Sequence, residues 1–399
     1  MRAPSTVEQT VLVCALIGTA QMTWGVTVPV LPLYLDAYGI AVGVLGPVVA
    51  AFGIGRVIAN VPAGLALRRL PPRAYLWSVS VALAVVTALT GMAGSTPALL
   101  AFRLVAGVFG GAAVTIGFAL LIAGSPAGRR GSVMATATVV QMSAGAAGAL
   151  LGGSVVGLAG PAGTFAVAAV PILLCLLWDA ARPASRYWSA PVRPAARSAP
   201  SVPSGNTVLL VALCALSFAT FLVRFAGEQG LIPVLAYDSG GLTPFTLGLA
   251  TAAGTLASLA AMPLIGRWVD RGARNTLLLP AGLIGAIALA GLPLLDVPLG
   301  FGAAIVVYSL ATSVIGVLPG VVTGEVFAAD AAGGVIGLTR TAGDLGAAVG
   351  PLAVFAVAGA AGTTAAGVLL GVLFLLAAVA LAAALIRTPR RVPAEVEVA

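Results

Sequence analysis

Residues 266–275 read GRWVDRGARN, a short charged run between two long apolar segments. One other stretch looks like it: residues 64–73 read GLALRRLPPR. The two runs begin 202 positions apart, since 266 − 64 = 202. A charged run that recurs between apolar segments at so large a spacing predicts a chain built from two similar halves.

The composition excludes a soluble protein. Of the 399 residues, 60% are hydrophobic and 8% are charged, whereas a soluble domain carries about 25% charged residues. Apolar runs of 18 or more residues recur, and each can cross the ~30 Å hydrocarbon core as a helix. The period-2 alternation of a transmembrane β-barrel is absent. The fold class is therefore an all-α integral membrane protein whose first partner is the lipid bilayer.

The charged residues are unusual in kind. All 20 cations are Arg and there is no His, which excludes a His-based proton relay, catalytic base or metal site. The net charge of +8 does not indicate nucleic-acid binding, because the Arg residues fall in the connections between apolar spans. Cys14, Cys175 and Cys214 lie within apolar segments, so we interpret them as small buried hydrophobic residues.

Twelve spans are predicted, six on each side of a stretch rich in Pro, Ser, Ala and Arg. The domains follow as an N-terminal six-helix bundle (1–178), an irregular cytoplasmic linker (179–206) and a C-terminal six-helix bundle (207–399). The spans lie near 10–35, 44–67, 74–94, 97–123, 131–157, 162–178, 208–237, 243–266, 276–295, 298–327, 333–358 and 363–387.

Arg residues occur only at the two termini, in the linker, within spans and in the even-numbered connections, and the odd-numbered connections contain none. By the positive-inside rule this places the even-numbered loops and both termini in the cytoplasm. We therefore predict a multi-pass protein of a bacterial-type plasma (inner) membrane.

The offset of 202 residues holds through the chain without gaps. A register kept across a loop, a charged run and two helix starts predicts two six-helix repeats of the same orientation, related by an axis along the membrane normal. It pairs Asp36 with Asp238, Gly39 with Gly241, Gly46 with Gly248, Arg69 with Arg271, Gly131 with Gly333, and Gly148 with Gly350.

These features resemble the major facilitator superfamily, and within it the drug/proton antiporter branch with twelve transmembrane helices. GRWVDRGARN looks like the family's loop signature between the second and third helices of a half. FRLVAGVFGGA, from Phe102, resembles the fourth-helix motif of Arg followed four residues later by Gly. AGAAGALLGG, residues 144–153, resembles the fifth-helix antiporter motif GxxxGPxxGG, with Ala144 and Ala149 departing from it.

The resemblance implies a central cavity lined by helices 1, 4, 7 and 10, with help from 2, 5, 8 and 11, while helices 3, 6, 9 and 12 face lipid. The sequence supports this arrangement, because the predicted spans three, six, nine and twelve have no charge in their interiors. A charge in lipid costs at least ~2.5–3.5 kcal/mol, so the charges in other spans should face the interior. They are Arg56, Arg103, Arg224, Glu228, Glu325, Arg340 and Asp344.

Substrate-binding candidates are selected by how deep each polar or aromatic residue lies within its predicted span. A residue roughly 10–13 positions into its span lies near the midplane at ~1.5 Å per residue, where such transporters bind substrate. Trp24 on the first helix adds an aromatic face. Contacts that only hold helices together are an equally good interpretation for the first-helix residues. The candidates are Gln21, Trp24, Arg56, Gln141 and Tyr308.

Proton coupling would have to run through a carboxylate, because the chain has no His. Arg224 and Glu228 are spaced i,i+4 and can pair on one helix face, near Gly and Pro residues that favour a bend. Arg340 and Asp344 repeat this spacing on the eleventh helix, and the depth of Asp344 favours it slightly over Glu228. The resemblance links Arg103 to proton coupling. A static ion pair and a structural Arg103 remain alternatives.

The charged runs are predicted to form an inner gate. The resemblance implies that this loop braces one half against the other, with Asp270 approaching the start of the fifth helix, where a helix N-terminus attracts an anion. The first copy has Arg68 where the Asp should be, so the gate would be held unevenly. The gating candidates are Asp270, Arg271, Arg68, Arg69 and Asp330.

The function expected from these features is proton-driven export of small amphipathic molecules by alternating access, with the proton gradient as driving force and no cofactor. Proton-coupled uptake of a small metabolite on the same fold is the alternative. A membrane sensor without flux is a third, and an enzyme is disfavoured because the membrane interior lacks His and paired carboxylates. We expect a monomer whose other partner is a small-molecule substrate.

Overall fold

The computed structural model describes residues 4–126, 129–190, 206–272, 274–327 and 329–387, and within these ranges every regular element is a helix. The elements are α1 (Thr6–Ala37), η1 (Val42–Val44), α2 (Leu45–Ala66), α3 (Pro72–Thr90), α4 (Thr96–Gly124), α5 (Arg130–Ala181), α6 (Ser185–Trp188), α7 (Thr207–Leu222), η4 (Val223–Leu231), α8 (Ile232–Asp238), α9 (Pro244–Asp270), α10 (Arg274–Gly291), η5 (Leu292–Leu294), α11 (Pro298–Val326) and α12 (Ala329–Ile386).

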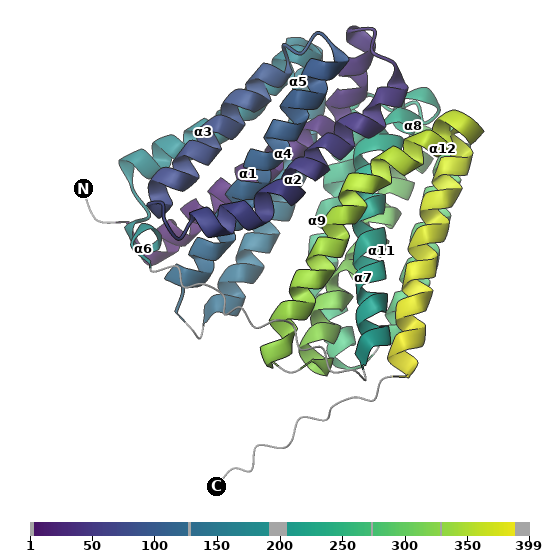
Figure 1. Cartoon of the computed structure of the whole chain (residues 1–399). Helices are drawn as coiled ribbons and strands as arrows, with labels where there is room; N and C mark the ends of the chain where they lie inside the picture. Colours follow the sequence, from purple (N-terminus) through teal and green to yellow (C-terminus); the bar gives the residue numbers. More distant parts are fainter. Residues whose placement is uncertain (1–3, 127–128, 191–205, 273, 328, 388–399) are drawn as a thin grey trace.

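Ten of the described helices are long and apolar enough to cross a membrane, against twelve predicted spans. The difference lies in α5 and α12, which have 52 and 58 residues and each contain two predicted spans. They turn back at Gly160 (φ 69°) and Gly362 (φ 86°), a conformation that a Cβ would strain. Figure 1 shows the second limb of α12, in yellow, returning beside the first. The two glycines are 202 residues apart, so the repeat extends to these bends.

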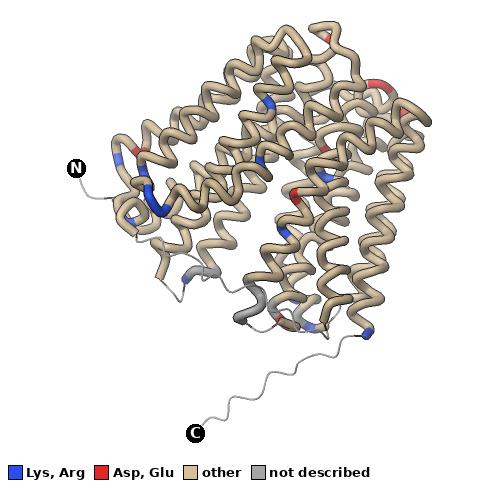
Figure 2. The backbone as a smooth tube through the Cα atoms, viewed as in Figure 1, with Lys and Arg blue, Asp and Glu red and all other residues tan. Residues whose placement is uncertain are grey.

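Each half has a hydrophobic core of its own, and the two halves meet along two seams. The N-terminal core also includes Phe225, Val234, Ala347 and Phe355 from the other half. One seam packs α2 against α12, and the other packs α5 against α9. Figure 1 shows the halves together at one end and diverging toward the end where α7 begins and α12 ends. We call the diverging end, with the turns that carry Arg68, Arg69, Arg129 and Arg271, the Arg-bearing end. The Arg-free end holds turns 38–43, 91–95, 239–243 and 292–297, none of which carries a cation (Figure 2).

At the Arg-free end the seams are closed by glycines that pack against backbone of the other half, and the same contact occurs at equivalent positions of the two repeats. A Cβ on Gly46 would lie 2.7 Å from the Pro351 carbonyl oxygen, and one on Gly248 would lie 2.5 Å from that of Ala149. Both members of the first contact are offset by 202 residues from those of the second. Tyr237 also donates a hydrogen bond of 2.5 Å to the Pro29 carbonyl oxygen. The described helices are therefore in close contact at the Arg-free end.

The outer surface is apolar where the sequence predicts lipid contact. Large exposed apolar side chains cover α3, α10 and the second limbs of α5 and α12, more than a soluble surface tolerates. They include Val81, Val85, Leu173, Leu174, Leu177, Leu283, Ile287, Val372, Leu376 and Val379. These elements correspond to the predicted spans three, six, nine and twelve.

The start of the expected linker is folded against the N-terminal half. Helix α5 continues to Ala181, and the fully buried Asp179 carboxylate accepts hydrogen bonds from Arg73 Nε, Trp77 Nε1, Trp188 Nε1 and the Ala184 backbone N–H, all at 2.8–3.1 Å. The irregular segment expected from residue 179 is therefore ordered as far as residue 190. The described residues do not include 191–205.

We expect Asp179→Ala to lower the free energy of unfolding of the N-terminal half by about 2–3 kcal/mol, because it leaves two half-buried indole N–H groups and the Arg73 guanidinium without their acceptor. Thermal unfolding in detergent, followed by tryptophan fluorescence, measures the change. The exposed Asp296, changed to Ala, is the matched control. Equal midpoints for the two variants would contradict a stabilising role for Asp179.

Candidate functional site

A cavity of about 510 Å³ lies between the halves. It extends from Glu228 on η4 toward Ala135 near the start of α5 and toward Met262 and Val317 near the ends of α9 and α11. Those helix ends lie at the Arg-bearing end, so the cavity approaches that end while the seams close the other. Hydroxyl side chains from four helices line it: Thr138, Thr220, Thr251, Thr255, Ser258, Ser309, Thr312 and Ser313.

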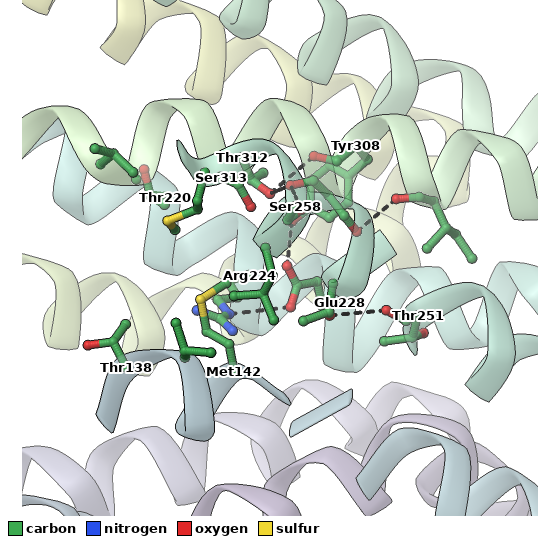
Figure 3. A pocket seen from close by; sticks show the side chains of 18 of the residues that line it. Thr138, Met142, Thr220, Arg224, Glu228, Thr251, Ser258, Tyr308, Thr312 and Ser313 are labelled. Carbon is green, nitrogen blue, oxygen red and sulfur yellow. Dashed lines mark hydrogen bonds and ion pairs between the residues drawn. The ribbon is translucent and has the colours of Figure 1, made fainter. Parts of the chain in front are cut away.

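An ion pair lies in this cavity. Arg224 Nε is 3.4 Å from Glu228 Oε2, and the Tyr308 hydroxyl donates to Glu228 Oε1 at 3.3 Å (Figure 3). Both charged residues belong to η4, a π-helical stretch inside the seventh predicted span. Wide helical turns of this kind are often found at functional sites. The bend expected from the Gly and Pro residues therefore takes the form of a π-helix.

A second pocket of about 130 Å³ adjoins the first. Gln21, Trp24, Arg56, Gln141 and Arg340 line it, together with both members of the ion pair. Gln141 Nε2 donates a long hydrogen bond of 3.5 Å to Gln21 Oε1. The two spaces adjoin one another, because six residues line both: Met142, Phe221, Arg224, Glu228, Thr251 and Thr255.

Aromatic rings support two of the guanidinium groups. The Arg224 Cζ lies 5.4 Å from the Trp24 ring centroid, and the Arg56 Cζ lies 5.9 Å from that of Phe225. The two rings contact one another, with centroids 5.7 Å apart. Because an aromatic face attracts a cation, this pair of rings holds Arg56 and Arg224 beside the pocket without neutralising their charge.

Asp344 lies apart from the cavity lining. Its side chain is only 4% exposed, and its Oδ2 accepts a 2.7 Å hydrogen bond from Asn60 Nδ2 across the α2–α12 seam. Thr115 in turn donates to Asn60 Oδ1 at 3.3 Å. Among the described residues, Asp344 has no cationic partner within 4 Å. The structure therefore places the two acids that the sequence considers for proton coupling in different settings.

Comparison with known proteins identifies the family. A family model described as the Major Facilitator Superfamily matches residues 13–227 and 213–398. The chain belongs to the major facilitator superfamily.

Solved structures share the fold. One is a bacterial homologue of the human lysosomal transporter Spinster, in an inward-facing, unoccupied conformation, at 13% identity over 99% of this chain and 100% of that one, with a TM-score of 0.78. Another is the nucleoside transporter NupG, at 11% identity over 94% and 99%, with a TM-score of 0.72. A search of the curated proteins finds no match. As a superfamily member the protein is a secondary transporter that works by alternating access.

Arg103, which the fourth-helix motif singled out, does not line either cavity of this superfamily member. It is 3% exposed in the N-terminal half, with its Cζ 4.7 Å from the Phe52 ring centroid. Its Nε and one terminal nitrogen have no hydrogen-bond partner among the described residues. A role for Arg103 in proton coupling stays a prediction.

The gating candidates are described only in part. Arg68, Arg69 and Arg271 are exposed at the Arg-bearing end. The side chains of Asp270 and Asp330 lie outside the described residues, so the uneven brace remains a prediction.

Several lining residues escaped the sequence analysis, although the repeat carried a signal for three of them. The offset of 202 positions gives each candidate an equivalent in the other half. The equivalent of Arg340 is Thr138, that of Asp344 is Met142, and that of Arg56 is Ser258. All three equivalents line the larger cavity. Applying the offset to each polar candidate would have found them. No sequence signal distinguishes Asn60, which contacts Asp344 only because the halves pack together.

Proposed function

We propose that this protein transports small amphipathic molecules in exchange for, or together with, protons, and that Glu228 is the proton carrier. The observation that supports this most directly is its position: among the described residues that line the two cavities, Glu228 is the one carboxylate. A carboxylate that lines the substrate cavity can exchange a proton with water and respond to substrate in the same space. Asp344, which depth alone favoured, is held in the seam by Asn60.

The lining favours an amphipathic substrate. Leu259, Met262, Ile305 and Val317 supply apolar surface, while the hydroxyl groups supply scattered hydrogen-bond donors and acceptors. Such walls take an apolar body with few fixed polar contacts. Arg224, Glu228 and Tyr308 then orient one polar group of the substrate.

The groups that face Glu228 define its proton chemistry. Arg224 on η4 pairs with it, Tyr308 on α11 donates to it, and Arg56 on α2 and Arg340 on α12 line the same pocket. The lining residues of α1, α5 and α9 carry no charge. Protonation of Glu228 removes the anionic partner of Arg224 and releases that guanidinium for another ligand.

The orientation follows from the Arg residues. Connections rich in Arg stay in the cytoplasm, so we place the Arg-bearing end, the linker and both termini there. The cavity then approaches the cytoplasmic side while the seams close the outside, an inward-facing state. A bacterial-type plasma membrane is the proposed location.

Two modes of coupling remain within this proposal. The fifth-helix resemblance favours export by exchange with protons. The ion pair in an Arg-rich pocket favours cotransport, because a ligand that replaces Glu228 at Arg224 binds better when Glu228 is protonated.

A substrate panel tests the proposal. Expressed in a bacterial host that lacks its own pumps, the protein is expected to change sensitivity to some drugs or metabolites. Everted vesicles with a preset proton gradient then reveal the mode, since addition of an exchanged substrate collapses the gradient. Binding in proteoliposomes without any flux would overturn the proposal in favour of a sensor.

A further inference from the structure

The smaller pocket has more positive than negative charge. Three guanidinium groups line it, those of Arg56, Arg224 and Arg340, and one carboxylate, that of Glu228. Asp344 is close enough to interact electrostatically with Arg56, although it does not line the pocket. Counting both acids, the local charge is 3 − 2 = +1.

The excess charge lacks protein partners. Among the described residues, Arg224 is the one cation of the three with an ion pair. No hydrogen bond to a described residue is formed by the guanidinium groups of Arg56 and Arg340, and Arg56 instead lies over the Phe225 ring. A cation held in a membrane interior without a counter-ion is costly. An anionic ligand that supplies the missing counter-ion offsets this cost and therefore binds more tightly than a neutral one.

The position of these groups matches a two-part ligand. The pocket with the three guanidinium groups adjoins the larger, mainly apolar cavity at shared residues, including Phe221 and Met142. We propose, resting on the function proposed above, that the substrate is a small organic anion with an apolar body. Its acidic group binds between Arg56, Arg224 and Arg340, and its body lies in the cavity of about 510 Å³.

The site also fixes the sign of coupling. The acidic group of the ligand and the Glu228 carboxylate compete for Arg224, which lies 3.4 Å from Glu228. The ligand therefore binds better to the form in which Glu228 is protonated, and by linkage the bound ligand favours that protonation. A proton and an anion that favour one another's binding cross together, so the site performs cotransport.

Three naphthalene probes of similar size test the charge preference. They are 1-naphthalenesulfonate, which is anionic, 1-naphthalenesulfonamide, which is neutral, and 1-naphthylmethylammonium, which is cationic. The sulfonate keeps its charge at any working pH, so it carries no proton itself. Binding to the purified full chain is measured by isothermal titration calorimetry at pH 5.5 and pH 7.5. We expect the sulfonate to bind at least about ten-fold more tightly than the other two, and more tightly at pH 5.5.

Variants assign the preference to the pocket. Arg56→Gln is expected to remove the roughly ten-fold preference for the sulfonate, whereas Arg56→Lys retains part of it because the charge remains. Arg387→Gln removes an exposed cation at the end of α12 and is the matched control for net charge. Size-exclusion profiles establish that each variant is folded. If Arg56→Gln does not fold, the test is the partial loss of the sulfonate preference in Arg56→Lys.

Equal affinity for the three probes, or tighter binding of the ammonium probe, would overturn the anion assignment. Sulfonate binding that is unchanged in both Arg56 variants would do the same. Either result leaves the proposed transport standing if a panel substrate still drives proton movement. Conversely, selective sulfonate binding with no flux of any panel substrate would support the anion site while the transport proposal fails.

Discussion

Glu228→Gln is expected to reduce proton-coupled flux of a panel substrate to the level of protein-free liposomes. Glutamine keeps the shape of glutamate and can still accept the Tyr308 hydrogen bond, but it cannot take up or release a proton. Proteoliposomes with an internal pH dye and an imposed pH gradient measure the coupled movement.

The same variant separates coupling from binding. Because glutamine imitates protonated glutamate, exchange of labelled for unlabelled substrate without a pH gradient should persist. Asp238→Asn, at the exposed end of α8, removes another carboxylate without touching the cavity and is the control. If Glu228→Gln retains full coupling while Asp344→Asn loses it, the carrier is Asp344 and the proposed assignment is wrong.

The second large effect concerns two glycines on α2. A Cβ on Gly53 would lie 2.8 Å from the Ala347 carbonyl oxygen, across the seam between the halves. A Cβ on Gly55 would lie 2.2 Å from that of Leu104, inside the N-terminal half. Gly53→Val is therefore expected to abolish transport with the protein folded, because the Arg-free end cannot close. Gly55→Val is expected to prevent folding, because α2 and α4 cannot approach.

Accessibility measures the state in which Gly53→Val is held. Thr27 is 2% exposed in the closed arrangement, so a cysteine placed there, with Cys14, Cys175 and Cys214 replaced, should react slowly with a membrane-impermeant maleimide from outside. The Gly53→Val background should accelerate that reaction. Equal expression, folding and transport for the Gly53 and Gly55 variants would contradict the different roles assigned to them, one in contact between the halves and the other in packing within the N-terminal half.

The sequence predicted the architecture because the signals for it can be seen along the chain without knowledge of tertiary contacts. Apolar run length, Arg placement and the offset of 202 residues each depend on the chain itself, and they indicate the spans, the repeat and the family. One contact between the halves joins residues at equivalent positions of the repeat. Gln229 donates a hydrogen bond of 3.2 Å to Thr27 Oγ1, and these two residues are 202 positions apart. Residues equivalent in the two halves meet there because the axis that relates the halves passes close to them.

The same signals identified the charged residues that line the cavities and several of the polar ones. Depth along a helix selected Gln21, Arg56, Gln141 and Tyr308, and all four line one of the two volumes. The i,i+4 spacing predicted the contact between Arg224 and Glu228. Depth says nothing about the direction in which a side chain points, however, and Asp344 is as deep as the others yet faces the seam.

The sequence by itself determined that this chain spans a membrane as two repeated helical bundles of a transporter family. Only the tertiary structure decided which charges share the cavity. Asp344 meets Asn60, 284 positions away, and Arg56 comes into the pocket with Arg340. Helix periodicity sets neighbours within one helix, whereas these contacts depend on the rotation of each helix and on the packing of one half against the other.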